Sequence, residues 1–163
     1  MKTLESKFDK IYKSNYAKVH RLCMGYTNGD EMLSADLAQE VFIKIWEHIG
    51  TFRNESSVST WIYRITVNTC LMSLRKKKPV EISNLLNVME STDDSFQEEN
   101  KSIQLKQLYN CINTLNSDGK SIILLELEGL PQKEIADVMG ISHEAIRVRI
   151  HRIKEKLTKC VKK

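Results

Sequence analysis

A set of basic and polar side chains near the carboxyl end could bind DNA. In the segment SHEAIRVRIHRIKEKL, the spacing predicts a helix that begins after Ser142 and buries one apolar stripe, which consists of Ile146, Ile150, Ile153 and Leu157. Its opposite face would carry Glu144, Arg147, Val148, His151 and Arg152. Arginine can hold guanine O6 and N7 or a phosphate, and histidine can donate to a base. The sequence therefore predicts a face that can enter the major groove, with Arg149 and Lys154 beside phosphates at its flanks.

The residues before this helix predict a helix-turn-helix motif. Gly129 can end one helix, Pro131 can occupy the first position of the next, and that short helix runs from Gln132 to Met139. Gly140 then suits the turn, and the small side chain of Ala136 lets the two helices approach closely. A plain amphipathic surface helix with ordinary charges remains the alternative interpretation of the same residues.

No group of residues predicts catalysis. The sequence has no glycine-rich phosphate loop and no metal-ligand cluster, and its four histidines are scattered without a nucleophile partner. Cys23, Cys70, Cys111 and Cys160 lack the close C-x-x-C spacing of zinc or redox sites, so we expect them to be reduced and mostly buried. We expect no enzyme activity and no catalytic residue, metal, cofactor or small-molecule substrate.

The charges fall into three blocks. Residues 1–78 hold 13 Lys and Arg against 8 Asp and Glu, residues 79–100 hold 6 acids and no base, and residues 101–163 hold 12 bases against 7 acids. Two basic bodies on either side of an acidic tether favour a polyanion such as nucleic acid, although surpluses this small also suit a solvated surface. The amino terminus lacks the apolar core of a signal peptide, and no apolar run is long enough for a membrane helix. We expect a cytoplasmic protein without membrane insertion.

Helical periodicity dominates the chain, and no β-type alternation is long enough to build a sheet. Apolar residues recur at helical spacing over 8–22 and 37–49, and a third helix begins near Ser57. One side of that third helix is apolar, and the other carries Arg64, Asn68, Leu71, Arg75 and Lys78. We predict an all-α fold of two small helical domains, residues 1–78 and 101–163, joined by a flexible linker over 79–100.

Three motifs together carry a family resemblance. The segments DLAQEVFIKIW (36–46) and TFRNESSVSTWIYRITVNTCLMSLRKKK (51–78), followed by the terminal helix-turn-helix, resemble a bacterial sigma factor of the sigma-70 family, in its small extracytoplasmic-function group. The resemblance covers nearly the whole chain. It implies a sigma2-like and a sigma4-like domain that bind core RNA polymerase, recognise the −10 and −35 promoter elements and help to open the duplex.

The resemblance also implies roles for individual residues. The helix that docks on a coiled coil of the polymerase β′ clamp would use Asp36, Leu37, Gln39, Glu40, Phe42 and Ile43, whereas we expect Trp46 to lie in the core. Recognition of the −10 element would use a loop that receives a flipped base, with Phe52, Asn54, Ser56 and Ser57, and a duplex-contacting face, with Arg64, Asn68, Arg75, Lys76 and Lys77. The residues that recognise bases of the −35 element would be Arg147, Val148, His151 and Arg152. The DNA backbone would be positioned by Ser142, His143 and Arg149.

The chain also departs from the family pattern. Pro131 stands where many members have a Ser or Thr helix cap. Val148 and His151 make the base-contacting face different from that of other members, so the resemblance does not imply a particular promoter sequence. The chain lacks the family's larger inhibitory region and middle domain, so we expect control by a separate anti-sigma factor. The competing hypothesis is a helix-turn-helix regulator that binds an operator without polymerase, which leaves the motifs at 36–46 and 51–78 without a purpose.

Overall fold

The computed structural model describes residues 2–52, 57–76 and 96–162. These residues form α-helices and one short 3-10 turn, with no strand among them, so the prediction of an all-α fold is confirmed. None of the described helices is long and apolar enough to cross a membrane. The elements are α1 (Lys2–Tyr26), α2 (Glu31–His48), η1 (Ile49–Thr51), α3 (Val58–Lys76), α4 (Phe96–Ile112), α5 (Ser117–Leu127), α6 (Gln132–Met139) and α7 (His143–Val161).

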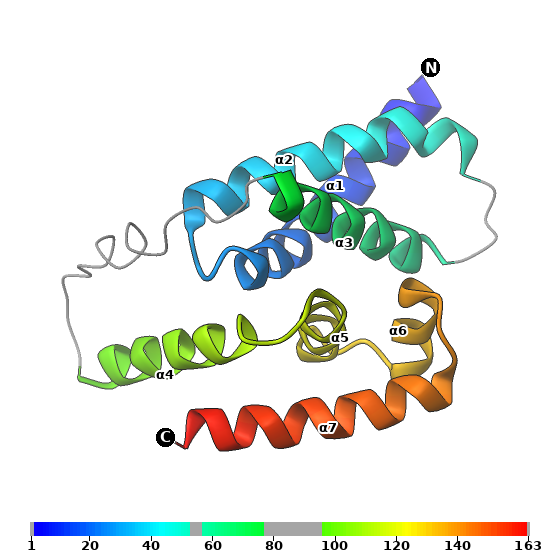
Figure 1. The fold of residues 1–163 in the computed structure, drawn as a ribbon. Helices are drawn as coiled ribbons and strands as arrows, with labels where there is room; N and C mark the ends of the chain where they lie inside the picture. Colours follow the sequence, from blue (N-terminus) through cyan, green and yellow to red (C-terminus); the bar gives the residue numbers. More distant parts are fainter. Residues whose placement is uncertain (1, 53–56, 77–95, 163) are drawn as a thin grey trace.

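Helices α1 to α3 form an amino-terminal layer (Figure 1). The chain reverses between α1 and α2 because Asn28 and Gly29 both adopt positive φ, and the carboxylate of Asp30 then accepts a hydrogen bond from the Leu33 amide at 3.0 Å. Burial fixes the three helices together, since each contributes side chains that are at most 1% exposed: Val19, Leu22, Val41, Ile45 and Ile62.

Helices α4 to α7 form a carboxyl-terminal layer, and short caps set its bends. Asn116 caps α5 through the Gly119 amide, and Gly140 ends α6 in the left-handed conformation with φ of 71°. Ser142 caps α7 by accepting from the Ala145 amide at 3.1 Å, as the sequence predicts. The sequence predicts Pro131 at the first position of the short helix, but in the structure Pro131 is the N-cap and α6 begins at the next residue.

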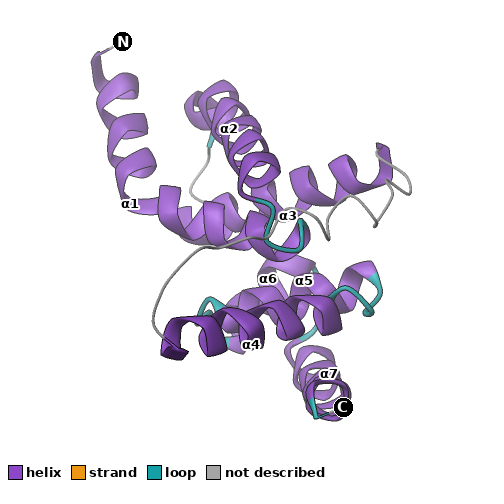
Figure 2. Ribbon diagram, turned by 90° about the vertical axis from the view of Figure 1, so that its left-hand side faces the viewer, coloured by secondary structure: helices purple, strands orange, loops and turns teal. Residues whose placement is uncertain are grey.

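The two layers are stacked on each other, which Figures 1 and 2 show from two sides. A single cluster of buried apolar residues runs through both of them. The boundaries of the two domains remain predictions. Helix α4 begins at Phe96, inside the segment predicted as a linker, and the rest of that segment, residues 79–95, lies outside the described residues.

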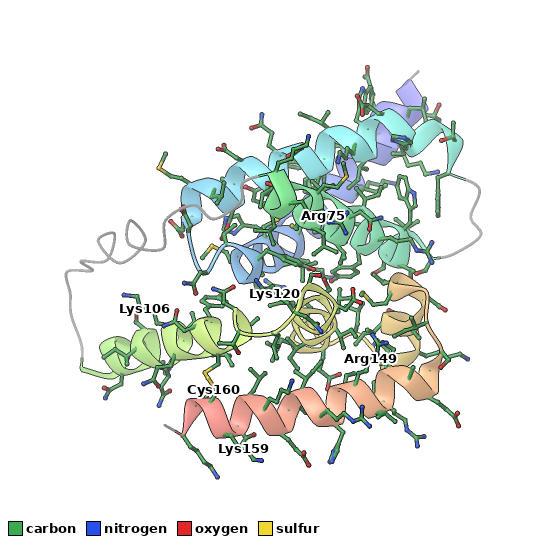
Figure 3. All side chains as sticks on the ribbon, viewed as in Figure 1. Arg75, Lys106, Lys120, Arg149, Lys159 and Cys160 are labelled. Carbon is green, nitrogen blue, oxygen red and sulfur yellow. A yellow bond between two sulfur atoms is a disulfide. The ribbon has the colours of Figure 1, made fainter. Side chains whose placement is uncertain are left out.

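The cysteines form two pairs, and one pair corrects the expectation from the sequence. Cys111 in α4 and Cys160 in α7 are joined by a disulfide across a Cα–Cα distance of 5.9 Å, close to the end of α7 (Figure 3). These residues are 49 positions apart, and only the packing of α4 on α7 brings them together. Cys23 and Cys70 are reduced and buried as expected, with their sulfur atoms 3.7 Å apart. Their mutual hydrogen bond and burial raise the pKa of the Cys70 thiol.

Candidate functional site

Helix α7 presents the basic surface that the sequence predicts. Its apolar stripe is buried, with Ile146 0% exposed and Ile150 2% exposed, so the opposite side must face solvent. We call this side the recognition face, and its members are the exposed residues Arg147, Val148, His151 and Arg152. The predicted backbone-positioning residues Ser142, His143 and Arg149 are exposed beside it, and Figure 3 marks Arg149 on α7.

The recognition face combines hydrogen-bond donors with one apolar side chain. It borders a hollow of about 490 Å³ that also includes Gln132, the first residue of α6. The guanidinium groups can contact guanine or phosphate, and Val148, 48% exposed, can contact a thymine methyl group. Sequence reasoning missed Gln132, although its position at the start of the first helix of the motif was a usable signal.

Two side-chain contacts hold residues around the recognition face. Lys154 binds Glu126 of α5 at 2.7 Å, and this contact ties α7 to the neighbouring helix. His151 places Nε2 3.1 Å from the Glu155 carboxylate one turn later. Both His151 and Glu155 are well exposed, so this second pair orients the imidazole without adding much stability.

A second basic surface lies on α3. We call it the α3 face, and its exposed members are Arg64, Asn68, Arg75 and Lys76. Buried Thr66 and Cys70 lie on the other side of the same helix and hold it against α1 and α2. Arg64 is already engaged, because its Nη2 donates to the backbone oxygen of Asp137 in α6 at 2.7 Å. Lys77 lies outside the described residues.

The loop before α3 is described only at its ends. Ser57 accepts a hydrogen bond from the Thr60 amide at 3.1 Å and so caps α3, while Asn54 and Ser56 lie outside the described residues. The Phe52 ring stacks on half-buried Trp61 with centroids 4.7 Å apart, and Lys7 lies 5.9 Å from the same ring. One face of the Phe52 ring is therefore covered by Trp61 at the edge of this loop.

The predicted polymerase-binding helix splits into a buried side and an exposed side. Leu37 and Phe42, both 3% exposed, pack inside the amino-terminal layer. The exposed side, which we call the α2 face, consists of Asp36, Gln39, Glu40, Ile43 and Trp46.

Trp46 corrects a prediction from the sequence. We expected it in the core, but its side chain is 46% exposed, beside the 52% exposed Ile43. It borders a hollow of about 540 Å³ whose lining includes Phe8, Tyr12 and Tyr16 of α1. These α1 aromatics were missed as candidate site residues, although their spacing of four residues places them on one helix face. The α2 face therefore joins charged groups to an aromatic hollow, a composition typical of protein interfaces.

Comparisons with known proteins find matches to both the amino-terminal and the carboxyl-terminal part of the chain. The family model for Sigma-70 region 2 matches residues 11–80, and the model for Sigma-70, region 4, matches residues 105–157. The chain is 35% identical to RNA polymerase sigma factor SigZ of Bacillus subtilis, over 78% of this chain and 72% of that protein. It is 33% identical to the ECF RNA polymerase sigma-E factor of Haemophilus influenzae, over 91% of this chain and 84% of that protein.

Two solved structures share the fold. CnrH, in complex with the cytosolic domain of CnrY, matches with a TM-score of 0.74 at 18% identity, over 97% of this chain and 89% of that chain. The sigma factor RpoE of Bartonella quintana, in complex with the anti-sigma factor NepR, matches with a TM-score of 0.73 at 19% identity, over 96% of this chain and 97% of that chain.

Proposed function

The chain belongs to the extracytoplasmic-function group of the sigma-70 family. On that premise we propose that the α2 face binds core polymerase and that the α3 face and the recognition face bind promoter DNA. It is a sigma factor, which binds bacterial RNA polymerase and promoter DNA. The family consists of DNA-binding regulators of transcription rather than enzymes. A free-standing operator-binding regulator is not favoured, because it gives no role to the region-2 match over residues 11–80.

The α2 face is the proposed contact with the β′ clamp of core polymerase. The observation that carries this assignment is the exposure of Gln39, Glu40, Ile43 and Trp46 on one side of a helix whose other side is buried. Ile43 and Trp46 supply apolar area at the edge of an aromatic hollow, and the polar pair can bind basic or amide groups around it. Leu37 and Phe42 hold this surface in place from the core.

The α3 face and the recognition face are the proposed promoter contacts. The α3 face is a basic stripe suited to the −10 region and consists of Arg64, Asn68, Arg75 and Lys76. The loop that begins after Phe52 and ends before Ser57 would contribute to the same contact. Arg147, Val148, His151 and Arg152 suit the −35 element because they project from a helix-turn-helix that can enter a major groove. The DNA backbone at the −35 element would be contacted by Ser142, His143 and Arg149.

A separate anti-sigma factor is the proposed regulator. RpoE of Bartonella quintana, which shares this fold, was solved in complex with the anti-sigma factor NepR. The hollow on the α2 face and the recognition face of α7 are open to such a partner, and so are Asn68, Arg75 and Lys76 of the α3 face. An inhibitor with apolar and acidic groups fits them best, since the hollow is aromatic and both DNA-facing surfaces are cationic.

A titration of fluorescently labelled chain with core polymerase tests the α2 assignment. The double variant Gln39→Ala with Glu40→Ala should bind core polymerase more weakly while keeping its helical circular dichroism. The matched control is Glu5→Ala with Gln104→Ala, which removes the same two residue types from exposed positions on α1 and α4. Equal affinity for both double variants would overturn the assignment.

A further inference from the structure

The two cysteine pairs differ in both state and surroundings. Cys111 of α4 and Cys160 of α7 are bridged, whereas Cys23 and Cys70 are free thiols although their sulfur atoms lie 3.7 Å apart. The free pair is enclosed in the core, since both of its side chains are 0% exposed. Their mutual hydrogen bond and burial raise the pKa of Cys70, so this pair offers little of the thiolate that redox chemistry needs. The free pair is therefore shielded from thiols and oxidants in solution.

The two halves of the bridge differ in exposure. Cys111 is 5% exposed and belongs to the core, whereas Cys160 is only partly buried in the last turn of α7. Figure 3 shows Lys159 at the same end of this helix, and the exposed Lys156 precedes Cys160 by one turn on the same side. These cations attract an anionic thiolate, and such an attacker reaches Cys160 more easily than Cys111.

The place where sigma factors act makes the bridge conditional. Sigma factors work with RNA polymerase in the cell interior. Thiols predominate there, and a disulfide that forms in such surroundings is usually transient or redox-sensing rather than a permanent crosslink. The bridged fraction then depends on the reduction potential of the cysteine pair relative to that of the thiol pool. We therefore expect the bridge in this chain to open and close with the state of that pool.

The bridge contributes strongly to the attachment of α4. Every side chain from residue 100 to residue 107 of this helix is exposed, and Leu108 is the first apolar side chain after them that packs on the core. Cys111 and Ile112, 5% and 0% exposed, then bury the end of α4 where it packs on α7. The buried stripe of α7 that lies behind the recognition face continues to Cys160. One covalent bond thus fixes α4 to the far end of the helix that carries the recognition face.

We propose that Cys111 and Cys160 form a thiol–disulfide exchange site, entered at Cys160, whose reduction loosens α4 from α7 and weakens the binding of the recognition face to DNA. The reaction partner is a low-molecular-weight thiol together with its disulfide. The exchange site rests on the two cysteines and their surroundings, whereas its effect on DNA rests on the proposed function of the recognition face.

Reduction takes two exchange steps. An external thiolate attacks Cys160 Sγ and forms a mixed disulfide with it, the bridge breaks, and Cys111 leaves as a thiolate that takes up a proton. A second external thiolate attacks the outer sulfur of the mixed disulfide, so Cys160 leaves as a thiolate and is protonated in turn. Two external thiols are thus oxidised to one external disulfide, and the bridge gains their two electrons and two protons. Oxidation is the reverse reaction, with the external disulfide as the oxidant.

Titration of the free chain with mixtures of reduced and oxidised glutathione tests the exchange site. Mass spectrometry of samples quenched in acid and alkylated in denaturant reports the state of each cysteine. Cys111 and Cys160 should become bridged together in one transition, while Cys23 and Cys70 stay free throughout. A bridge that never forms, that persists in reduced glutathione alone, or whose two cysteines titrate separately would overturn the site.

Single variants test the point of entry. Cys111→Ser keeps Cys160, Cys160→Ser keeps Cys111, and each variant is treated with oxidised glutathione. The mixed disulfide should form on Cys160 about tenfold faster than on Cys111, because exchange requires access for the partner. Equal rates, or a faster reaction at Cys111, would overturn Cys160 as the point of entry.

Amide hydrogen exchange of the free chain tests what the bridge holds. Reduction should speed exchange in α4 and in the last turn of α7 and leave α1 to α3 unchanged, because a segment with fewer constraints opens more often. The double variant Cys111→Ser with Cys160→Ser should match reduced wild type in either glutathione mixture. Cys23→Ala with Cys70→Ala is the matched control, since it removes two cysteines but keeps the bridge. Equal exchange in α4 of oxidised and reduced wild type would overturn the loosening.

Binding of the holoenzyme to a fragment that it transcribes tests the effect on DNA. Reduction should weaken binding several-fold for wild type and for the Cys23→Ala, Cys70→Ala control. The Cys111→Ser, Cys160→Ser variant should bind weakly in both states, which separates the bridge from any action of glutathione on polymerase. Wild-type affinity that does not change with redox state would overturn the effect on DNA. A pair that exchanges in a chain that never directs transcription would sink the proposed function and keep the exchange site, and active transcription with a pair that never exchanges would do the reverse.

Discussion

The indole of Trp46 meets the Phe8 ring edge-on, with ring centroids 5.3 Å apart and planes at 80°. This contact joins α2 to α1 and leaves almost half of the indole open to solvent. Edge-to-face aromatic pairs are favourable because the positive edge of one ring meets the negative face of the other. Trp46 is therefore held in a fixed orientation while it still offers apolar area to a partner.

The exposure of Trp46 predicts a separation between binding and stability. Trp46→Ala should weaken association with core polymerase by about 1–3 kcal/mol, as loss of an aromatic anchor does. Leu37→Ala, on the buried side of the same helix, should instead lower the free energy of unfolding by about 2–5 kcal/mol. Fluorescence titration with core polymerase and urea denaturation measure the two effects. Normal polymerase affinity in the Trp46 variant would remove this residue from the interface.

Arg147 should read base identity within the −35 element. Arg147→Ala is expected to relax preference at one or two base positions by about 1–3 kcal/mol, since it removes a side chain able to make bidentate contacts. Selection of bound promoters from a randomised pool, in the presence of polymerase, reports the preference at each position. Lys156→Ala is the control, because this exposed cation on α7 lies outside the recognition face. An identical preference profile for Arg147→Ala and wild type would contradict the assignment.

The Cys111–Cys160 bridge should stabilise the carboxyl-terminal layer. It closes a long loop, with its ends 49 positions apart, and restricts the unfolded chain, so reduction should lower the free energy of unfolding by about 4 kcal/mol at most. Urea denaturation with and without a dithiol reductant measures the difference. The double variant Cys111→Ser with Cys160→Ser should show no difference, since Cys23 and Cys70 are unbridged. A reductant effect that survives in the double variant would refute this account.

Alkaline pH should weaken the contact between the layers through Tyr63. Burial and the nearby Glu128 carboxylate raise its pKa to about 12, above the ordinary value of 10.0. A raised pKa in the folded state gives stability that is complete below pH 10 and is lost as pH rises through 12. Tyr63→Phe should therefore lose less unfolding free energy than wild type between pH 9 and about 11.5.

The control for this pH effect is Tyr12→Phe, because the Tyr12 side chain is 41% exposed. Lys120 acts in the opposite direction, since burial lowers its pKa, but it contributes equally in all three chains. Urea denaturation at each pH gives the values. If Tyr63→Phe lost as much free energy of unfolding at alkaline pH as wild type, ionisation of Tyr63 would not be the cause of that loss.

Local features of the fold could be predicted because their causes lie within a few residues. Gly140 and Ser142 set the turn of the helix-turn-helix, and Gln132–Met139 forms the predicted short helix. The two faces of α7 also follow from spacing alone, since a helix with a buried stripe must expose the other side. These features, together with the family resemblance, were enough to locate the recognition face.

Features that depend on distant contacts could not be predicted. The sequence pattern gives Trp46 and Phe42 similar apolar positions on α2. Only the packing of α1 decides that Trp46 is exposed and Phe42 is buried. The bridge from Cys111 to Cys160 depends on how α4 packs on α7. The contact of Arg64 with Asp137 spans 73 positions and depends on the stacking of the two layers, which periodicity does not encode.

Runoff transcription with purified bacterial core polymerase on genomic fragments tests most directly that this chain is a specificity subunit. Transcripts should appear only when both the chain and core polymerase are present, and their start sites should share one spaced pair of upstream sequence elements. No new transcripts from any fragment, together with tight and sequence-specific binding of a duplex by the chain alone, would contradict the account.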